Sequence, residues 1–234
     1  SRNLSKAKDF ARTLTSPPVV ADIQKLPAFC ELVIEAASAE AVDTIVTCSL
    51  SANTPVMVLS CGALLGRQDL FDMALQHHTS IHVPSGAIIG LDGLMAAAAG
   101  QIDSVTMITT KPPEGLRGAP GVKLSGIDLD HLTSPVVLYE GSVSDGFKLF
   151  PANINVSAAI SMAGIGPHLT QIRVVADPLA TRNIHEVVVK GDFGQMQLRI
   201  ENIPSLENPR TGRLTALSVL AYLRQLLSPV HLGV

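Results

Sequence analysis

The stretch between residues 171 and 189 contains the residue types that proton transfer needs. Residues 171–175 are rich in β-branched side chains, residues 177–183 include Asp, Pro, Thr and Asn, and a second β-branched run follows at 184–189. This pattern predicts two strands joined by a turn, with His185 at the start of the second strand. An imidazole with an ordinary pKa near ~6.5 exchanges protons at neutral pH, so His185 is the candidate general base. The alternative is a half-buried sheet residue without a chemical role.

Composition limits the class of protein that can use such a histidine. The chain has 234 residues, of which 47% are hydrophobic and 16% charged, and this predicts a soluble globular protein of one large or two small domains. A net charge of -3 without a long basic run argues against a nucleic-acid partner. No apolar run reaches the ~18 residues that span a bilayer, and we expect no signal peptide. The expected partner is a small molecule or a second copy of the chain.

The cysteines indicate the compartment. Cys30, Cys48 and Cys61 are odd in number and form no C-x-x-C pair. We therefore expect three buried, reduced thiols in a cytoplasmic protein, with neither a disulfide framework nor a metal site.

The first ninety residues alternate between strand and helix patterns. This alternation predicts a parallel sheet, and hence a Rossmann-like doubly wound α/β domain. The expected strands are residues 17–21, 32–38, 55–60 and 81–83, and the expected helices are residues 4–14, 39–49 and 69–78.

Ligands of such sheets bind beyond the carboxyl ends of the strands. Those ends are residues 35–38, 60–63 and 84–87, three turns of small residues that let a flat ligand approach the backbone. Ala37 and Ser38, in the first turn, are candidate cofactor contacts, and Ser38 is also the expected N-cap of the helix that follows.

A dinucleotide-binding domain normally opens with a strand and a G-x-G-x-x-G turn, and nothing before Ser1 supplies them. We therefore expect the chain to begin just after the second strand of the domain, without its first βα unit. Arg2 then lies where an acidic residue usually binds the ribose, and an arginine there favours the 2′-phosphate of NADP. The alternative is that Arg2 is a frayed terminal residue.

The middle of the chain has a different pattern. Five strand-like runs, several with alternating polarity, predict an α+β domain with an open-faced mixed sheet, covered on one face by helices at 144–150 and 155–165. The free face predicts a homodimer. We expect a loop at 115–126, a last helix at 211–227, a dinucleotide-binding domain of residues 1–90 and 208–234, and a catalytic and dimerisation domain of residues 91–207. The runs are residues 103–110, 136–140, 173–176, 183–189 and 195–202.

Seven short motifs, in order over nearly the whole chain, resemble the L-aspartate dehydrogenase family. The resemblance implies an NAD(P)-dependent oxidoreductase that converts L-aspartate through iminoaspartate to oxaloacetate and ammonia, or the reverse, and that supplies iminoaspartate to NAD biosynthesis. The expected lack of the first βα unit would depart from the family. The motifs are PSGAIIGLD (84–92), TKPP (110–113), YEGS (139–142), FPANINV (150–156), VADP (175–178), NIH (183–185), and ENIP (201–204) with ENPRT (207–211).

The resemblance also implies site residues. The family's catalytic histidine falls on His185, and its nicotinamide-cofactor contacts fall on Ala87 and Asn155. Lys111 is our candidate for a substrate carboxylate. Asn155 as a simple N-cap and Lys111 as a solvated loop lysine are the alternatives. Two other functions stay open: a related dehydrogenase of homoserine or dihydrodipicolinate type, and a non-catalytic dimeric binding protein that lacks the amino-terminal unit.

Overall fold

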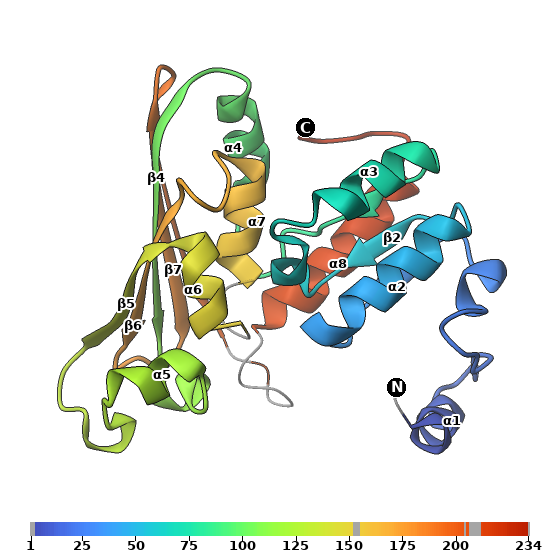
Figure 1. The fold of residues 1–234 in the computed structure, drawn as a ribbon, viewed down its shortest axis with the longest axis horizontal. Coiled ribbons are helices and arrows are strands. Elements are labelled where there is room, and N and C mark those ends of the chain that lie inside the picture. The colour runs from blue at the N-terminus through green and yellow to red at the C-terminus, as the bar shows by residue number, and fades with distance from the viewer. Residues whose placement is uncertain (1–2, 152–154, 204, 206–211, 234) are drawn as a thin grey trace. The chain divides into compact units, whose positions relative to one another are not determined.

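The computed structural model describes residues 3–151, 155–203, 205 and 212–233. The chain divides into two compact units, Ser1–Val83 and Pro84–Val234 (Figure 1). The sequence predicts different domain boundaries, with residues 208–234 joined to the first domain. These boundaries stay a prediction.

The first unit is a parallel α/β unit, as the alternating pattern predicts. Its three strands lie in the order β1-β2-β3, and all neighbours are parallel. Helix α2 begins after Ser38 and buries Val42, Val46 and Leu50, whose spacing places them on one helix face. The elements are α1 (Leu4–Arg12), η1 (Leu26–Phe29), β1 (Val33–Glu35), α2 (Ala39–Ser51), β2 (Val56–Val58), η2 (Cys61–Leu64), α3 (Gln68–Gln76) and β3 (Ile81–His82).

One strand expected in this unit is wrong. Residues 17–21 form no strand. Pro17 and Pro18 have no N–H to donate to a neighbouring strand, and Val19 is 83% exposed, so neither pairing nor burial stabilises an extended segment there.

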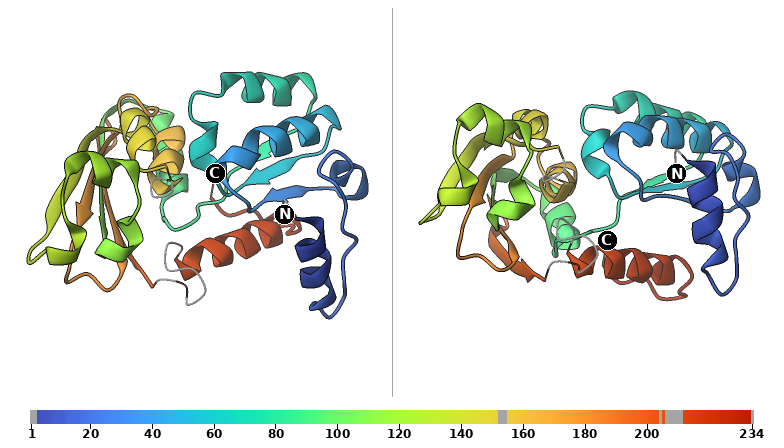
Figure 2. Two further views of the ribbon diagram at one scale, coloured as in Figure 1. Left: turned by 60° about the horizontal axis from the view of Figure 1, so that its bottom comes forward. Right: turned by 90° about the horizontal axis from the view of Figure 1, so that it is seen from below.

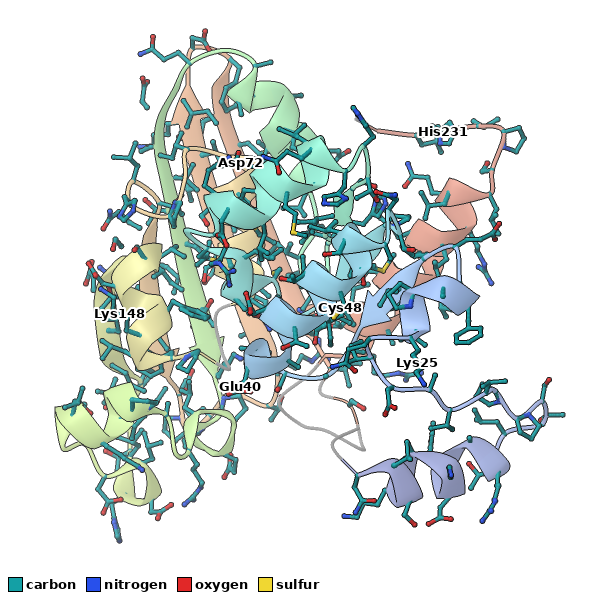
Figure 3. The ribbon with its side chains drawn as sticks, turned by 45° about the vertical axis from the view of Figure 1, so that its right-hand side comes forward. Lys25, Glu40, Cys48, Asp72, Lys148 and His231 are labelled. Atoms are coloured by element: carbon teal, nitrogen blue, oxygen red, sulfur yellow. The ribbon has the colours of Figure 1, made fainter. Side chains whose placement is uncertain are left out.

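The cysteines are free thiols but are not all buried. Cys61 is buried, whereas Cys30 and Cys48 are half-buried. Figure 3 shows Cys48 on helix α2. The expectation of three buried thiols is therefore wrong for two of them, because each lies at the margin of the core.

The second unit contains the expected mixed sheet, with strands in the order β5-β6-β4-β7-β8. Strands β4 and β6 are parallel, and the other neighbours are antiparallel. All five strands expected from the alternating pattern are confirmed. They are β4 (Ile102–Lys111), β5 (Val136–Ser142), β6 (Gln171–Ala176), β7 (Asn183–Gly191) and β8 (Gly194–Asn202).

Helices cover one face of this sheet (Figures 1 and 2). They are α4 (Leu91–Ala98), α6 (Val143–Leu149) and α7 (Asn155–Ala163). Leu94 of α4 and Ile160 of α7 pack on Met107 and Val187 in one fully buried cluster. Each such side chain stabilises the fold by roughly 1.5–3 kcal/mol. On the opposite face of β4, Ile108 is only half-buried. Buried and less buried side chains therefore alternate along this strand, as expected.

The segment expected to be a loop at 115–126 is partly helical. It contains the end of η3 (Pro113–Leu116) and all of α5 (Pro120–Ser125), because a proline opens each of them. The remaining elements are η4 (Leu129–His131) and α8 (Arg213–Leu226), which confirms the last expected helix. Within the described ranges, no helix is long and apolar enough to cross a membrane.

Candidate functional site

Strand register gathers Lys111 and His185 at one end of the sheet of the second unit. Lys111 ends β4 and pairs with Ala176, the last residue of β6. Two residues earlier on β4, Thr109 lies directly opposite His185 of β7. Because side chains two residues apart share a face, Thr109 and Lys111 both point to the helix-covered side of the sheet, as His185 does.

His185 is held tightly in this position. It is 2% exposed, and its Nδ1 atom lies 3.2 Å from Oγ1 of Thr109. Val187 and Val189 follow on the same face and are fully buried. Glu186 points to the opposite face, where it pairs with Arg199 of β8 at 2.5 Å. The ring therefore lies beside the hydroxyl of Thr109 and shares its strand face with buried apolar side chains.

Burial sets the charge of the two basic groups. Desolvation, with a smaller contribution from Lys111, lowers the pKa of His185 to about 3, and desolvation lowers the pKa of Lys111 to about 8. The ordinary histidine pKa near ~6.5 that the sequence analysis assumes for His185 is therefore wrong, because burial disfavours the protonated ring. Lys111 is 5% exposed, so it is not a solvated loop lysine.

The turn that contains Ala87 is anchored to this end of the sheet. The Ala87 carbonyl accepts a 2.8 Å hydrogen bond from Nδ2 of Asn202, the last residue of β8. The N–H of Gly86 donates to Oγ of Ser218 on α8 at 3.1 Å. Gly86 has a φ of 65°, a left-handed conformation that favours glycine. Two hydrogen bonds and one glycine thus fix the backbone at Ala87.

Asn155 is the first residue of α7, as expected for a helix start. Val156, beside it, packs against the cluster that contains Val187, two residues beyond His185. Packing of α7 on the sheet therefore fixes the position of Asn155. The residues just before it, 152–154 of the FPANINV motif, lie outside the described ranges.

In the first unit, a buried carboxylate shapes the turn after β1. Glu35 is 1% exposed and accepts hydrogen bonds from the Ala37 N–H at 2.7 Å and from the Ser60 N–H and Oγ at 2.9 and 3.0 Å. It ties together the carboxyl ends of β1 and β2, and Ala37 remains exposed. Ser38 makes no side-chain cap on α2. This small, accessible turn at a helix N-terminus fits a dinucleotide.

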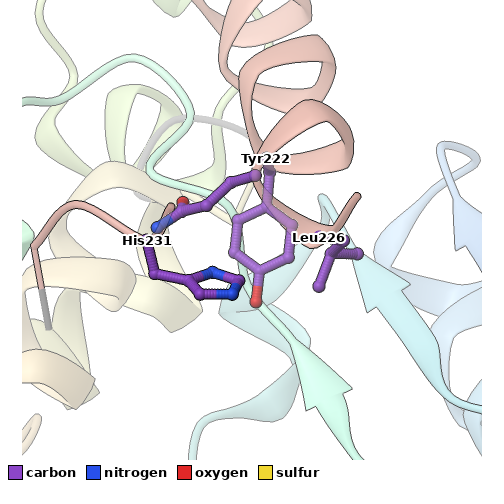
Figure 4. Close-up of a pocket in the computed structure, with 4 residues that line it drawn as sticks. Tyr222, Leu226 and His231 are labelled. Carbon is purple, nitrogen blue, oxygen red and sulfur yellow. The ribbon is translucent and has the colours of Figure 1, made fainter. Parts of the chain in front are cut away.

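Arg2 and the ENPRT motif are outside the described ranges. Figure 4 shows a pocket on the second unit whose described lining residues come from α8 and the segment after it. None of the expected site residues is among them; they are Tyr222, Gln225, Leu226 and His231.

Comparison with known proteins shows the family. Residues 92–226, more than half of the chain, match the family model described as "Aspartate dehydrogenase, C-terminal". The chain belongs to the aspartate dehydrogenase family. Residues 1–84 match the model described as "Homoserine dehydrogenase, NAD binding domain", so the first unit is an NAD-binding domain of Rossmann type.

Relatives of this family cover nearly the whole chain. An L-aspartate dehydrogenase of Methanosarcina acetivorans is 47% identical over 98% of this chain and 86% of its own length. L-aspartate dehydrogenase 3 of Bordetella bronchiseptica is 45% identical over 99% and 85%. The crystal structure of an aspartate dehydrogenase from Thermotoga maritima, 31% identical, has a TM-score of 0.73 and covers 94% of this chain and 83% of its own.

Sequence reasoning missed three residues of the site: Glu35, Thr109 and Asn202. A signal existed for Thr109, because it lies two residues before Lys111 in an alternating strand, opposite the NIH motif. Asn202 lies in the ENIP motif, but only the fold brings it to Ala87. Glu35 ends an apolar strand, and its partner Ser60 is far away in the sequence.

The buried charge of Lys111 predicts a pH-dependent stability. Between about pH 8 and 10.5, the unfolded chain binds a proton on Lys111 that the folded chain has lost. The free energy of unfolding should therefore rise with pH through this window, by up to about 3 kcal/mol. In urea denaturation at several pH values, Lys111→Met should lose this rise, and Lys190→Met, at an exposed strand position, should keep it. An unchanged pH dependence in Lys111→Met would contradict the prediction.

Proposed function

We propose that this protein is an NAD(P)-dependent L-aspartate dehydrogenase that oxidises L-aspartate to iminoaspartate and hydrolyses it to oxaloacetate and ammonia, or runs the reverse reductive amination. The observation that carries the proposal is a pair of buried basic side chains, Lys111 and His185, on adjacent strands of a chain from this family. A buried cation suits a dicarboxylate substrate, and a buried neutral imidazole suits proton transfer.

The cofactor residues are those of two small-residue turns and one helix start. In the first unit, Ala37 and Ser38 would meet the dinucleotide, and Arg2 would meet a 2′-phosphate. In the second unit, the small side chain of Ala87 would leave room for the nicotinamide ring beside a fixed backbone. The side-chain amide of Asn155 would hydrogen-bond the carboxamide of that ring. When bound, a nicotinamide cofactor supplies the hydride acceptor for Cα of aspartate.

Lys111 and His185 then have separate roles toward the substrate. The Lys111 ammonium binds a substrate carboxylate. His185 takes a proton from water as the water oxygen bonds to the imine carbon, so an iminium and water become an amino alcohol and the ring becomes imidazolium. The imidazolium returns that proton to the amino group, and the neutral ring then takes the hydroxyl proton as the C–N bond breaks. This gives the ketone and ammonia, and the ring releases its proton to solvent.

A homoserine-type dehydrogenase is the second candidate. The homoserine dehydrogenase of Thiobacillus denitrificans has a TM-score of 0.56 at 14% identity, a similarity of fold alone. Homoserine carries one carboxylate and aspartate carries two, so a substrate screen separates the two functions. Lys111, as a buried cation, favours aspartate.

The proposed activity predicts nicotinamide reduction that depends on aspartate. The assay follows NADH or NADPH, with the protein including any sequence that precedes Ser1. We expect turnover with L-aspartate and not with homoserine, and NADP at least as effective as NAD because of Arg2. Arg2→Asp should shift the preference toward NAD. Equal effects of this change on both cofactors would remove the argument from Arg2, and turnover of homoserine alone would contradict the proposed function.

The role of His185 predicts a catalytic loss without a binding loss. His185→Ala should lower kcat by roughly 10²–10⁴-fold and leave the Kd of the cofactor unchanged. His131→Ala, at an exposed surface position, should keep kcat. Burial already keeps His185 neutral near pH 7. The rise of kcat/KM that follows deprotonation of His185 should therefore occur at a pH below the ordinary histidine range. Normal turnover by folded His185→Ala would contradict the role.

We also propose that the open face of the five-stranded sheet binds a second copy of the chain. Half-buried Ile108 and Val188 lie on this face. Arg199 pairs with Glu186 and Glu201 on the same face. Positive and negative charges therefore both occur near the apolar residues. An apolar surface with both signs can be self-complementary about a twofold axis.

The dimer proposal predicts a change of mass in solution. The chain should sediment as a dimer at micromolar concentration, and Val188→Glu should shift it to monomer, since a carboxylate would be buried without a partner. Val19→Glu, the same change at an 83% exposed site of the first unit, should leave the dimer intact. A monomeric parent protein would contradict the proposal.

The cytoplasm is the compartment that we propose. The three cysteines are free thiols, although two of them are partly accessible. A reducing compartment keeps accessible thiols in that state.

A further inference from the structure

We propose that Thr109 is a positioning residue, which holds His185 through Nδ1 so that Nε2 is the nitrogen that exchanges protons with the substrate. The inference rests on the proposed function for the identity of the substrate. The hydrogen bond itself is a property of the folded chain.

The first support is the geometry of the pair. Thr109 of β4 and His185 of β7 are directly opposed in an antiparallel ladder, and Oγ1 lies 3.2 Å from Nδ1. Thr109 is 1% exposed and His185 is 2% exposed, so bulk water does not compete for the contact between Oγ1 and Nδ1. The β-branched threonine also restricts its own χ1 rotation, which keeps the hydroxyl in place. The contact is therefore a fixed part of the sheet.

The second support is the chemistry of a neutral imidazole. Such a ring carries an N–H on one nitrogen and a lone pair on the other. A hydrogen bond that fixes the N–H at one nitrogen therefore fixes the lone pair at the other. A general base needs its lone pair on the nitrogen that faces the substrate. The contact joins Nδ1 to Oγ1 of Thr109, and in the tautomer that we propose Nδ1–H is the donor, which leaves the lone pair on Nε2. The same Nδ1–H bond persists when Nε2 accepts a proton, so the ring need not rotate during the reaction.

The third support is that Thr109 brings no charge. A carboxylate at Nδ1 would stabilise the imidazolium and raise the pKa of the ring. A hydroxyl orients the ring and leaves it a weak base that readily returns its proton. This suits a step in which the proton taken from water passes on to the departing amine.

The test compares three threonine variants. Thr109→Val removes the hydroxyl and keeps the shape, and Thr109→Ser restores the hydroxyl. Thr170→Val is the matched control, because Thr170 is fully buried in the same unit and its hydroxyl has no hydrogen-bond partner within the described ranges. Circular dichroism and thermal unfolding confirm that each variant is folded.

Two measurements follow. Heteronuclear NMR of the imidazole nitrogens, without substrate and assigned by comparison with His185→Ala, reads the tautomer. We expect Nδ1–H in the parent, in Thr109→Ser and in Thr170→Val, and a mixture with Nε2–H in Thr109→Val. Steady-state kinetics should show kcat reduced about 10- to 100-fold in Thr109→Val, with an unchanged cofactor KM, and near-parent kcat in the other two.

The outcomes separate this inference from the proposed function. Parent-like tautomer and kcat in folded Thr109→Val would overturn the inference, as would a Thr109→Ser variant as impaired as Thr109→Val. A parent protein that does not oxidise aspartate would overturn the proposed function alone. The tautomer measurement would still decide whether Thr109 orients the ring, because it needs no substrate.

Discussion

The structure of the candidate site depends on the pairing of β4 with β7. This register places Thr109 opposite His185 and puts Lys111 on the same face, two residues further along β4. A shift of one residue would turn all of these side chains to the other face of the sheet. The register is fixed by the buried cluster behind it, in which Met107 and Val187 pack against α4 and α7. The same strand register therefore determines both the geometry of the site and the packing of the core.

Burial of two basic groups in such a place opposes stability. Desolvation lowers the pKa of both Lys111 and His185, and an apolar pair of similar size would cost the fold less. Buried groups with strongly shifted pKa values are typical of functional sites. The apolar cluster supplies the stability that lets the sheet hold these side chains in fixed positions.

Under the proposed function, the two units would recognise ligands through different features. In the first, backbone and small side chains form the turn after β1, and the buried Glu35 carboxylate holds that turn in shape. In the second, ionisable side chains project from a rigid sheet, and Ala87 is tied to Asn202. In that proposal, accessible backbone at a helix N-terminus would bind the dinucleotide, and a charged group with a proton acceptor would bind the reacting substrate.

The sequence by itself determined the family and most of the element types, with residues 17–21 and 115–126 as exceptions. The period of two identified all five strands of the mixed sheet. Ordered motifs singled out His185, Ala87 and Asn155, and the need for a cation beside a carboxylate singled out Lys111. Local patterns carry this information because side-chain alternation is a property of a single strand. The tertiary structure decided which residues meet. Thr109 contacts His185, 76 residues away, and depth of burial set both pKa values. Neither follows from one segment, because strand register and desolvation arise only when distant segments pack together.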